Sequence, residues 1–438
     1  MISLKLNYQN NISKINFWAL LLFIFWLPLK DDYLPIILAL WIFTWLLEGN
    51  FKSRLLKLPQ KQLFYSLSFY FILTVLAIFH SSDFEYGFFQ IQEKLSMIFF
   101  PLFLLGSNEK VKKNYKIIFY TFILGNLVAV LYCLGYTFFT NLIFENNSFF
   151  IKYWTYDGFK EVPFWQLINM RYNIFSYSYL SIFKHPSYFT VYLLFCILIL
   201  VYSIREKLIS KSWTKLAAYF LILAFSFFIY LLQSRAGIIS MALIFIFIPI
   251  IEIQKRLKKR YLAILITTFA IFGIIIITNS RIKNNFAELK ELFVSPSNFS
   301  LQTSDSRYQL WYTSIQVIKE NFWFGTSPAN LTDKLVLKYD ELGFKLSADG
   351  KLNSHNQYLE TFAGLGVFGF LSLMFILIYS FVISIKKHNY LLFFLILILS
   401  FNFLFESMMN RMAGILFMMF FMSLLGFANI REFEGKKT

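Results

Sequence analysis

Three short polar segments of this sequence contain residue types that can handle phosphate groups and protons. They are Ser234-Arg235-Ala236-Gly237, Asp305-Ser306-Arg307 and Ser354-His355-Asn356. The planar guanidinium of arginine binds phosphate oxygens in pairs and stays charged at physiological pH. Histidine exchanges a proton near neutral pH. These segments therefore predict a site where arginine binds an anion and His355 moves a proton.

Each of these segments also has a plainer interpretation, which the sequence leaves open. Arg235 sits in a very short turn between two apolar runs, where an arginine can extend its charge to the membrane interface. Arg307 begins a predicted helix, whose N-terminus favours anions, but it can equally pair with Asp305 or Glu320. His355 can be an ordinary loop residue.

Further candidates are weaker. His185 begins another apolar run, and Glu406 and Arg411 flank a short turn in which a structural ion pair between them is the plainer expectation. Glu360 follows His355 by five residues, so helical spacing places it off the same face. The four histidines are widely separated, and the two cysteines lie within apolar runs. We therefore expect no metal site and no cofactor.

The composition sets the class of protein that positions these residues. The chain has 438 residues, of which 58% are hydrophobic and 15% are charged, whereas soluble domains carry about 25% charged residues. The net charge of +17 is spread over short basic clusters between apolar runs, as in membrane proteins. We therefore predict an all-α, polytopic transmembrane helix bundle and no nucleic-acid partner.

The number and direction of the membrane spans follow from the apolar runs and from the basic residues between them. Basic residues concentrate in alternate connections, including both termini, whereas the short connections of the opposite set carry one each. This alternation predicts about twelve spans, with both termini in the cytoplasm. The runs lie at residues 17–29, 33–47, 63–79, 95–106, 117–140, 185–204, 216–233, 236–251, 261–279, 356–385, 390–405 and 412–428.

A long polar excursion interrupts the spans on the opposite side of the membrane. We expect spans 1–9 within residues 1–279, a helical loop at 280–355 and the last three spans with a cytoplasmic tail at 356–438. Within the loop, the apolar spacing predicts helices at 281–294, from Arg307 onwards and around 331–342. The second has Ser306 and Gln309 in the positions of a capping box. Its predicted apolar face is Trp311, Ile315, Ile318 and Phe322, and that of the third is Leu331, Leu335, Tyr339 and Leu342.

The order of these motifs resembles that of the O-antigen ligase and polymerase superfamily of bacterial membrane glycosyltransferases. The resemblance covers roughly residues 180–425. It lies in the turn at Arg235, the segment Arg307-Tyr308-Gln309-Leu310-Trp311 with the later Gly325, and the segment His355 to Glu360. Gly364, Gly366 and Gly369 follow, and then Phe405-Glu406-Ser407 with Arg411 and Gly414.

This resemblance implies a donor glycan carried on undecaprenyl diphosphate at the periplasmic face of the inner membrane. The acceptor would be lipid A–core for a ligase or another carrier-linked glycan for a polymerase, and membrane lipids would surround the protein. Arg235 and Arg307 would bind the diphosphate, and His355 would be the catalytic base of an inverting, metal-independent transfer. His185, Glu406 and Arg411 would support the site.

Two alternatives to a ligase remain open at this point. The large single loop before His355-Asn356 favours the ligase over the polymerase, but the motifs do not separate the two. A flippase for the same lipid-linked glycan would need polar or broken segments near the bilayer midplane, and the polar residues here gather at one face. The interpretation as a transferase requires Arg235, Arg307 and His355 to lie close together at the non-cytoplasmic end of the helix bundle.

Overall fold

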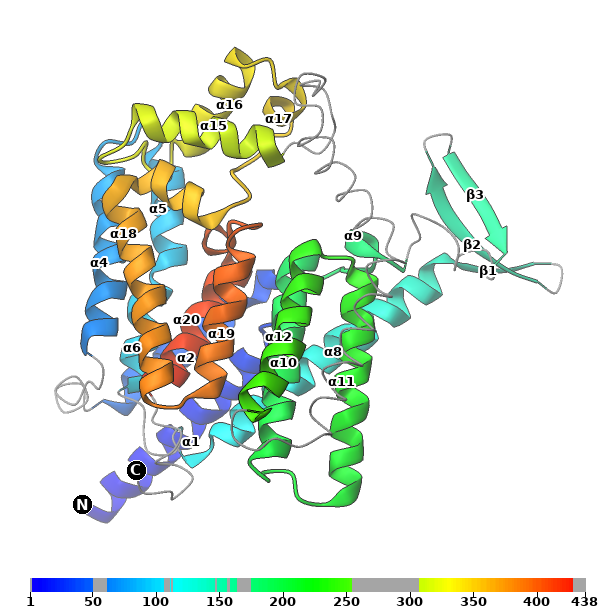
Figure 1. Ribbon diagram of the computed structural model, residues 1–438. Coiled ribbons are helices and arrows are strands. Elements are labelled where there is room, and N and C mark those ends of the chain that lie inside the picture. Colours follow the sequence, from blue (N-terminus) through cyan, green and yellow to red (C-terminus); the bar gives the residue numbers. More distant parts are fainter. Residues whose placement is uncertain are drawn as a thin grey trace. The chain divides into compact units, whose positions relative to one another are not determined.

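The computed structural model describes residues 2–49, 61–105, 111, 113–145, 148–155, 158–163, 175–253 and 307–427, and most of them are helical. The chain divides into two compact units. The first unit comprises residues 1–27, 31–119 and 297–438, and the second comprises 28–30 and 120–296. Figure 1 shows both, coloured along the sequence.

The first unit contains both ends of the chain. Its N-terminal part comprises α1 (Ile2–Trp26), a 3-10 turn η1 (Asp31–Tyr33), α2 (Leu34–Glu48), α4 (Lys61–Ile78), α5 (Phe84–Lys94) and α6 (Ser96–Leu105). Its C-terminal part comprises α15 (Arg307–Glu320), α16 (Leu331–Glu341), α17 (Lys345–Asp349), α18 (Gln357–Lys386), α19 (Tyr390–Asn402), η4 (Met408–Asn410) and α20 (Met412–Phe427).

The second unit contains the middle of the chain. It comprises most of α8 (Tyr115–Asn141), three strands, α9 (Tyr177–Leu180), α10 (Pro186–Arg205), α11 (Ser212–Leu232) and α12 (Arg235–Ile253). The strands β1 (Leu142–Glu145), β2 (Ser148–Thr155) and β3 (Gly158–Pro163) form an antiparallel sheet in that order. Ile151 lies opposite Leu142 on one side and Val162 on the other.

The sheet was not expected in an all-α chain. Its residues are rich in aromatic and β-branched types, which favour strands, and the sequence places Asn146-Asn147 and Asp157-Gly158 between the strand segments. Such pairs are typical of hairpin turns. The sequence therefore contained a signal for the sheet, in the connection between two predicted spans.

The predicted apolar runs correspond closely to helices. Every run has a helix over it except 261–279, which lies outside the described residues, as does the predicted helix 281–294. Among the described residues, α4, α8, α10, α11 and α18 are long and apolar enough to cross a membrane, and α12, α19 and α20 contain shorter apolar stretches. The chain is therefore a mostly helical membrane protein. The count of twelve spans stays a prediction.

The short run at 95–106 turns out to be the second half of a longer helical segment. The Leu95 N–H donates to the Ile91 carbonyl at 2.9 Å, and the Phe99 N–H donates to the Leu95 carbonyl at 3.0 Å. The helical hydrogen bonding therefore continues from α5 into α6. The polar composition of α5, which includes Gln90, Glu93 and Lys94, concealed this helix in the sequence.

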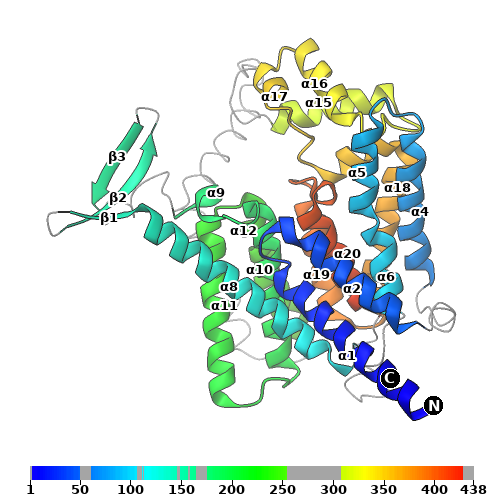
Figure 2. The same ribbon diagram turned by 180° about the vertical axis from the view of Figure 1, so that it is seen from behind.

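A stack of aromatic rings forms the core of the first unit. The Phe23 ring lies 5.6 Å from the rings of both Trp41 and Phe100, and Phe100 lies 5.7 Å from Phe420 in an edge-to-face arrangement. These rings come from α1, α2, α6 and α20, which lie side by side in Figure 2. Because such pairs contribute about 0.5–1.5 kcal/mol each beyond their burial, the stack joins the N-terminal hairpin to the last helix.

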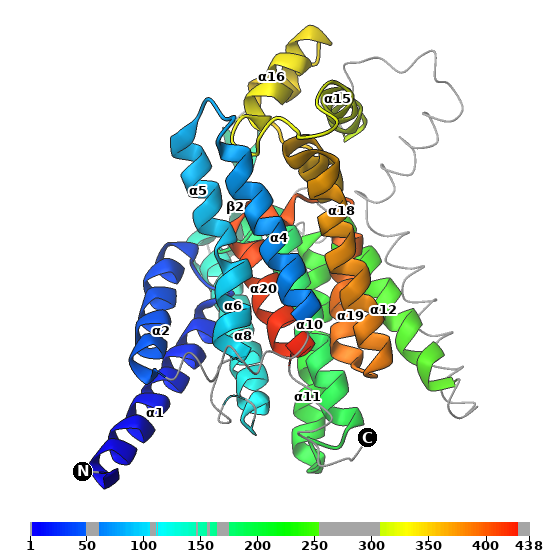
Figure 3. The same ribbon diagram turned by 90° about the vertical axis from the view of Figure 1, so that its left-hand side faces the viewer.

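Helices α15, α16 and α17 form a cap at one end of the first unit, beside the start of α18 (Figure 3). We call residues 307–355 the lid. It has an apolar core of its own, which also includes Ala363 of α18. The predicted face of α16 is confirmed, since Leu331, Leu335 and Tyr339 are fully buried and Leu342 packs beside them.

The predicted apolar face of α15 is confirmed in part. Ile318 is buried and Trp311 packs against the lid core, but Ile315 and Phe322 are exposed, and Leu310 and Val317 are buried instead. The burying face is set by the packing of α16, α17 and α18 against α15, so it includes small polar residues that the apolar pattern does not reveal. Gln309 is one of them, and its Oε1 accepts a hydrogen bond from the Ser347 hydroxyl of α17 at 3.3 Å.

A break in α18 fastens the lid to that helix. Gly366 has φ +65° and ψ −166°, which interrupts the helix and frees backbone groups for other partners. The Thr326 N–H donates to the Ala363 carbonyl at 2.8 Å, and the Val367 N–H donates to the Phe322 carbonyl at 2.9 Å. A Cβ on Gly366 would lie 2.2 Å from the Trp323 oxygen, so the contact needs glycine.

A second fastening involves Asn330, which precedes α16. Its Oδ1 accepts hydrogen bonds from the Ser81 hydroxyl at 2.9 Å and from the Ser82 hydroxyl at 3.0 Å. Both serines lie in the connection between α4 and α5. The lid is therefore held by two separate parts of the first unit.

Candidate functional site

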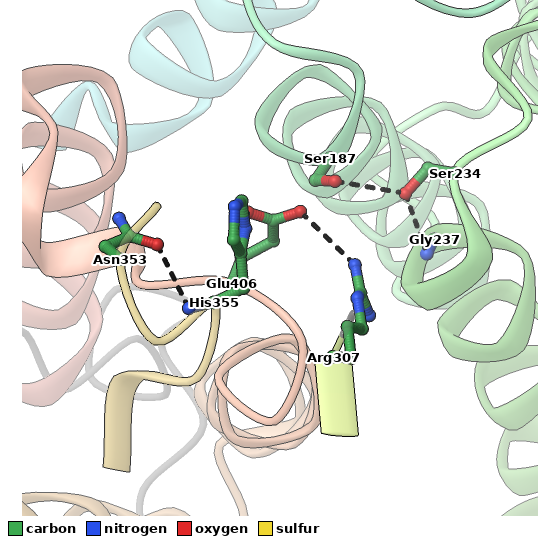
Figure 4. Close-up of polar contacts among 7 residues, drawn as sticks. All are labelled: Ser187, Ser234, Gly237, Arg307, Asn353, His355 and Glu406. Atoms are coloured by element: carbon green, nitrogen blue, oxygen red, sulfur yellow. Dashed lines mark hydrogen bonds and ion pairs between the residues drawn. The ribbon is translucent and has the colours of Figure 1, made fainter. Parts of the chain in front are cut away.

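A single carboxylate joins two of the residues that the sequence singled out. Glu406 Oε2 lies 3.3 Å from His355 Nδ1, and Glu406 Oε1 lies 3.8 Å from Arg307 Nη2. Figure 4 shows Glu406 beside His355, with a dashed line to Arg307. The Glu406 side chain is only 7% exposed, whereas those of His355 and Arg307 are 33% and 28% exposed. The carboxylate is thus buried behind two reachable functional groups.

Arg307 is placed by its position in α15. It is the first residue of that helix, where free backbone N–H groups add to the positive potential of the guanidinium. The guanidinium carbon lies 5.4 Å from the centre of the Phe405 ring, a cation–π contact that restrains the side chain. Glu320, a partner that the sequence had suggested, instead pairs with Lys338 at 2.6 Å.

His355 sits in a backbone conformation that few residues adopt. Its φ is +41°, in the left-handed region, which costs a residue other than glycine about 1–2 kcal/mol. Its N–H donates to Asn353 Oδ1 at 3.0 Å. On its other side, Asn356 Oδ1 caps α18 by accepting from the N–H groups of Tyr358 and Leu359. The surrounding hydrogen bonds therefore hold the imidazole in place.

A second buried carboxylate lies behind this segment. Glu360 is 5% exposed, and its Oε2 accepts the Ser354 N–H at 3.0 Å while its Oε1 accepts from Asn410 Nδ2 at 2.8 Å. The hydroxyls of Ser354 and Ser314 are 3.0 Å apart. Glu360 thus connects the residue before His355 to the turn after Glu406, although helical spacing had placed it off the His355 face.

The first turn of α18 makes further contacts with the connection between α19 and α20. The Gln357 N–H donates to the Phe403 carbonyl at 2.7 Å, and Gln357 Oε1 accepts the Met409 N–H at 2.6 Å. The Tyr358 hydroxyl donates to the Ser400 carbonyl at 2.8 Å. These bonds fix the segment carrying His355 against the segment carrying Glu406.

A buried lysine lies near this network. Lys94 of α5 is 2% exposed, its Nζ donates to Gln90 Oε1, and it interacts electrostatically with Glu360 and Glu93. Arg411 is exposed and interacts electrostatically with Glu93. The sequence had paired Arg411 with Glu406, but the structure turns the Glu406 carboxylate to Arg307 and His355.

Two groups in the lid have displaced pKa values. The hydrogen bonds from Lys338 to Glu320 and Glu341 raise the pKa of the Lys338 ammonium above its ordinary value. Burial raises the pKa of Tyr339. Lys338 therefore stays charged and Tyr339 neutral at physiological pH, so neither supplies a proton acceptor to the site.

The remaining sequence candidates lie in the second unit. His185 precedes α10, with its ring edge-on to those of Tyr177 and Tyr188. Arg235 is the first residue of α12, and the structure describes its backbone but not its side chain. The turn before it is as short as predicted, since α11 ends at Leu232.

The starts of α10 and α12 lie together. The Ser187 and Ser234 hydroxyls are 3.5 Å apart, and Ser234 Oγ accepts the Gly237 N–H at 3.2 Å, as Figure 4 shows. A Cβ on Gly237 would lie 2.2 Å from Thr190 Cγ2. The backbones of His185 and Arg235 are therefore neighbours. The predicted convergence of Arg235 with Arg307 and His355 stays a prediction.

Sequence reasoning missed Glu360, Asn410 and Lys94 as members of the network. For Glu360 and Lys94 the available signal was their charge, since charged side chains that are not solvated in an apolar protein need partners. Lys94 had been counted as the basic residue of a short connection.

The apolar helices and the clustered imidazole, carboxylate and guanidinium define a helical membrane protein with a polar site at the ends of its helices. Residues 218–374 match the family model described as O-antigen ligase. This match confirms the superfamily that the motifs indicated, and it includes Arg235, Arg307 and His355. His185, Glu406 and Arg411 lie outside the matched region. No match is found among curated proteins.

Proposed function

We propose that this chain is a glycosyltransferase of the O-antigen ligase type. It would transfer a glycan from undecaprenyl diphosphate to an acceptor such as lipid A–core at the periplasmic face of the inner membrane. The observation that carries this proposal is the Glu406 carboxylate, which lies against both His355 and Arg307. The family match over residues 218–374 supplies the reaction class.

The contacts of Glu406 suit a proton acceptor. A carboxylate only accepts hydrogen bonds, so a neutral imidazole bonded to it carries its proton on Nδ1. The Nε2 lone pair is then free to take the proton of an acceptor hydroxyl. Glu406 would also stabilise the imidazolium that forms, while its burial keeps water from competing for it.

The transfer then balances without a further reactant. The acceptor oxygen forms a bond to the anomeric carbon as the bond from that carbon to the diphosphate oxygen breaks, with inversion. The hydroxyl proton goes to His355 Nε2, and the electron pair of the broken bond goes to the departing undecaprenyl diphosphate. Arg307 would stabilise the charge that develops on the diphosphate, and we assign Arg235 the same role.

The topology that we propose has about twelve spans, with both termini in the cytoplasm. The lid would then face the periplasm, where a carrier-linked glycan is presented. The alternation of basic residues along the sequence supports this arrangement. So does the presence of a helix at each apolar run that lies within the described residues. His185 and Arg411 would bind parts of the substrate farther from the reacting bond.

Complementation of a ligase-deficient host tests the proposal. Variants His355→Ala, Arg307→Ala and Arg235→Ala should lose surface glycan while the membrane level of the protein stays normal. Glu341→Gln, an exposed substitution in the lid, is the matched control and should retain it. Normal surface glycan in the His355→Ala strain would refute the assigned role.

The glycan that accumulates in a deletion strain separates ligase from polymerase. Loss of a ligase leaves long glycan on the carrier, whereas loss of a polymerase leaves lipopolysaccharide capped with one repeat. Transfer by purified protein in detergent, with carrier-linked donor and lipid A–core, separates both from a flippase, which makes no glycosidic bond.

A further inference from the structure

The left-handed backbone at His355 needs a restraint that the transferase site does not itself provide. Asn353 and Asn356 restrain the two sides of His355, but both are loop residues close to it in sequence. Glu360, in the first turns of α18, adds a restraint from a buried side chain, since its Oε2 accepts the N–H of Ser354, the residue directly before His355.

The other oxygen of Glu360 reaches the segment that carries Glu406. Its Oε1 accepts from Asn410 Nδ2 at 2.8 Å, and Asn410 belongs to η4, shortly after Glu406. Two carboxylates therefore link the same pair of segments. Glu406 links them through its contact with the His355 ring, and Glu360 links them through Ser354 and Asn410.

Glu360 is costly to bury as an anion unless a cation lies near it. The hydrogen bonds from Ser354 and Asn410 lessen that cost, and the nearby charges of His355 and then of the buried Lys94 of α5 favour the anion as well. Glu93 adjoins Lys94 and interacts with it as well, and Arg411 interacts with Glu93. The network thus extends from α5 to the segment that holds His355.

We propose that Glu360 is a positioning residue, whose buried carboxylate accepts from Ser354 and Asn410 and so holds the Ser354–Asn356 segment where His355 meets Glu406. This inference rests on the proposed function for its catalytic consequence, but its structural content does not depend on glycosyl transfer. Neither Glu360 nor Lys94 contacts substrate in this scheme.

The first experiment measures how accessible His355 is to diethyl pyrocarbonate, with peptide mass spectrometry of the full-length protein in detergent. Exposed His388 serves as the internal reference. Glu360→Gln keeps the shape but loses the charge, so the segment should relax, free the imidazole from Glu406 and raise the relative labelling of His355 severalfold. Unchanged labelling in a folded Glu360→Gln protein would overturn the proposal.

The second experiment is a double-mutant cycle in thermal unfolding. Lys94→Met and Glu360→Gln should each lower the transition temperature, because each leaves one buried charge unbalanced. The double variant should be more stable than the sum of the two effects predicts, since both charges are gone. Strict additivity would show that Lys94 does not balance Glu360. Glu341→Gln, with an exposed carboxylate, is the control and should leave both readouts unchanged.

Kinetics then separates this inference from the proposed function. Glu360→Gln should lower kcat and leave the KM for donor unchanged, because Arg307 is not part of the restrained segment. If the wild-type protein transfers glycan and Glu360→Gln has normal kcat, the inference fails and the function stands. If the wild type transfers none, the labelling experiment and the double-mutant cycle still decide the inference.

If Glu360→Gln does not fold, Asn410→Ala takes its place. This variant removes one hydrogen-bond partner of Glu360 and must raise His355 labelling.

Discussion

The Nδ1 atom of His355 lies 3.3 Å from Oε2 of Glu406, although 51 residues separate the two along the chain. The Glu406 carboxylate is nearly inaccessible, and the imidazole is one-third exposed. The Nδ1 atom of the ring therefore contacts a buried carboxylate, and part of the ring is exposed to solvent. This relationship sets the first prediction.

Glu406→Gln should lower the rate of transfer more than it lowers the stability of the protein. The glutamine amide can still contact the imidazole, but it cannot stabilise the imidazolium by charge. We expect kcat to fall by about 10- to 100-fold, less than the roughly 10²- to 10⁴-fold loss for His355→Ala, in which the proton acceptor itself is removed. Initial rates of glycan transfer in detergent measure both. Equal losses for the two variants would contradict the supporting role of Glu406.

Arg307→Lys should raise the KM for donor even though the charge is kept. Lysine lacks the planar fork that binds two phosphate oxygens, and it makes a weaker contact with the Phe405 ring. A loss of about 1–2 kcal/mol, or roughly 5- to 30-fold in kcat/KM, is expected. Phe405→Leu is the matched variant that removes only the ring. If Phe405→Leu costs as much as Arg307→Lys, the ring contact rather than the fork is the important feature.

Gly366→Ala and Gly325→Ala should loosen the lid. A Cβ on Gly366 would lie 2.2 Å from the Trp323 oxygen, and one on Gly325 would lie 2.5 Å from the Gly364 backbone. Limited proteolysis within 322–344 should speed up in both variants. Gly343→Ala is the control, because Gly343 also has positive φ but a Cβ there meets nothing within 4 Å. Equal cleavage of all three variants would mean that backbone strain, not the close approach, is responsible.

Tyr339→Phe should stabilise the lid. The buried Tyr339 hydroxyl has no hydrogen-bond partner among the described residues, and removing such a group gains about 1 kcal/mol. Hydrogen exchange of α16 amides measures this gain. A loss of protection in Tyr339→Phe would show that the hydroxyl is hydrogen-bonded.

The same residue predicts how the lid responds to alkaline pH. Burial raises the pKa of Tyr339 in the folded lid above that of the unfolded chain. The corresponding stability is complete below the unfolded pKa of about 10 and is lost as the pH rises beyond it. Between about pH 9 and pH 11, a range centred on that pKa, the wild-type lid should therefore lose hydrogen-exchange protection faster than the lid of Tyr339→Phe. Parallel curves would exclude this linkage.

Much of the helical architecture could be predicted because the physics of apolar spans is local. A run of apolar residues needs a helix whatever lies beside it, and each described run has one. Helix α5 was missed because it buries Gln90 and Lys94, which hydrogen-bond to each other within α5, while Lys94 also interacts electrostatically with Glu360 of α18. The exposed Ile315 was misplaced for a related reason, since tertiary packing chose a different face of α15 from the most apolar one.

The site was predicted in part, and the errors share one cause. Arg307 was identified from its residue type and its place at the start of a predicted helix, and His355 from its residue type and its place just before an apolar run. Glu406 was identified but given the wrong partner, because sequence proximity favoured Arg411 over residues far along the chain. Glu360 was set aside by helical spacing, but α18 begins only at Gln357, so that spacing does not apply to Ser354 or His355.

The break at Gly366 ties the lid to the helix that follows His355. The Phe322–Thr326 segment is hydrogen-bonded on both sides of the break, to Ala363 and to Val367. Moving the lid away from the first turns of α18 would break these bonds and disturb the residues beside His355. Under the proposed function, a bulky glycan would therefore approach along the exposed parts of His355 and Arg307, with the lid in place.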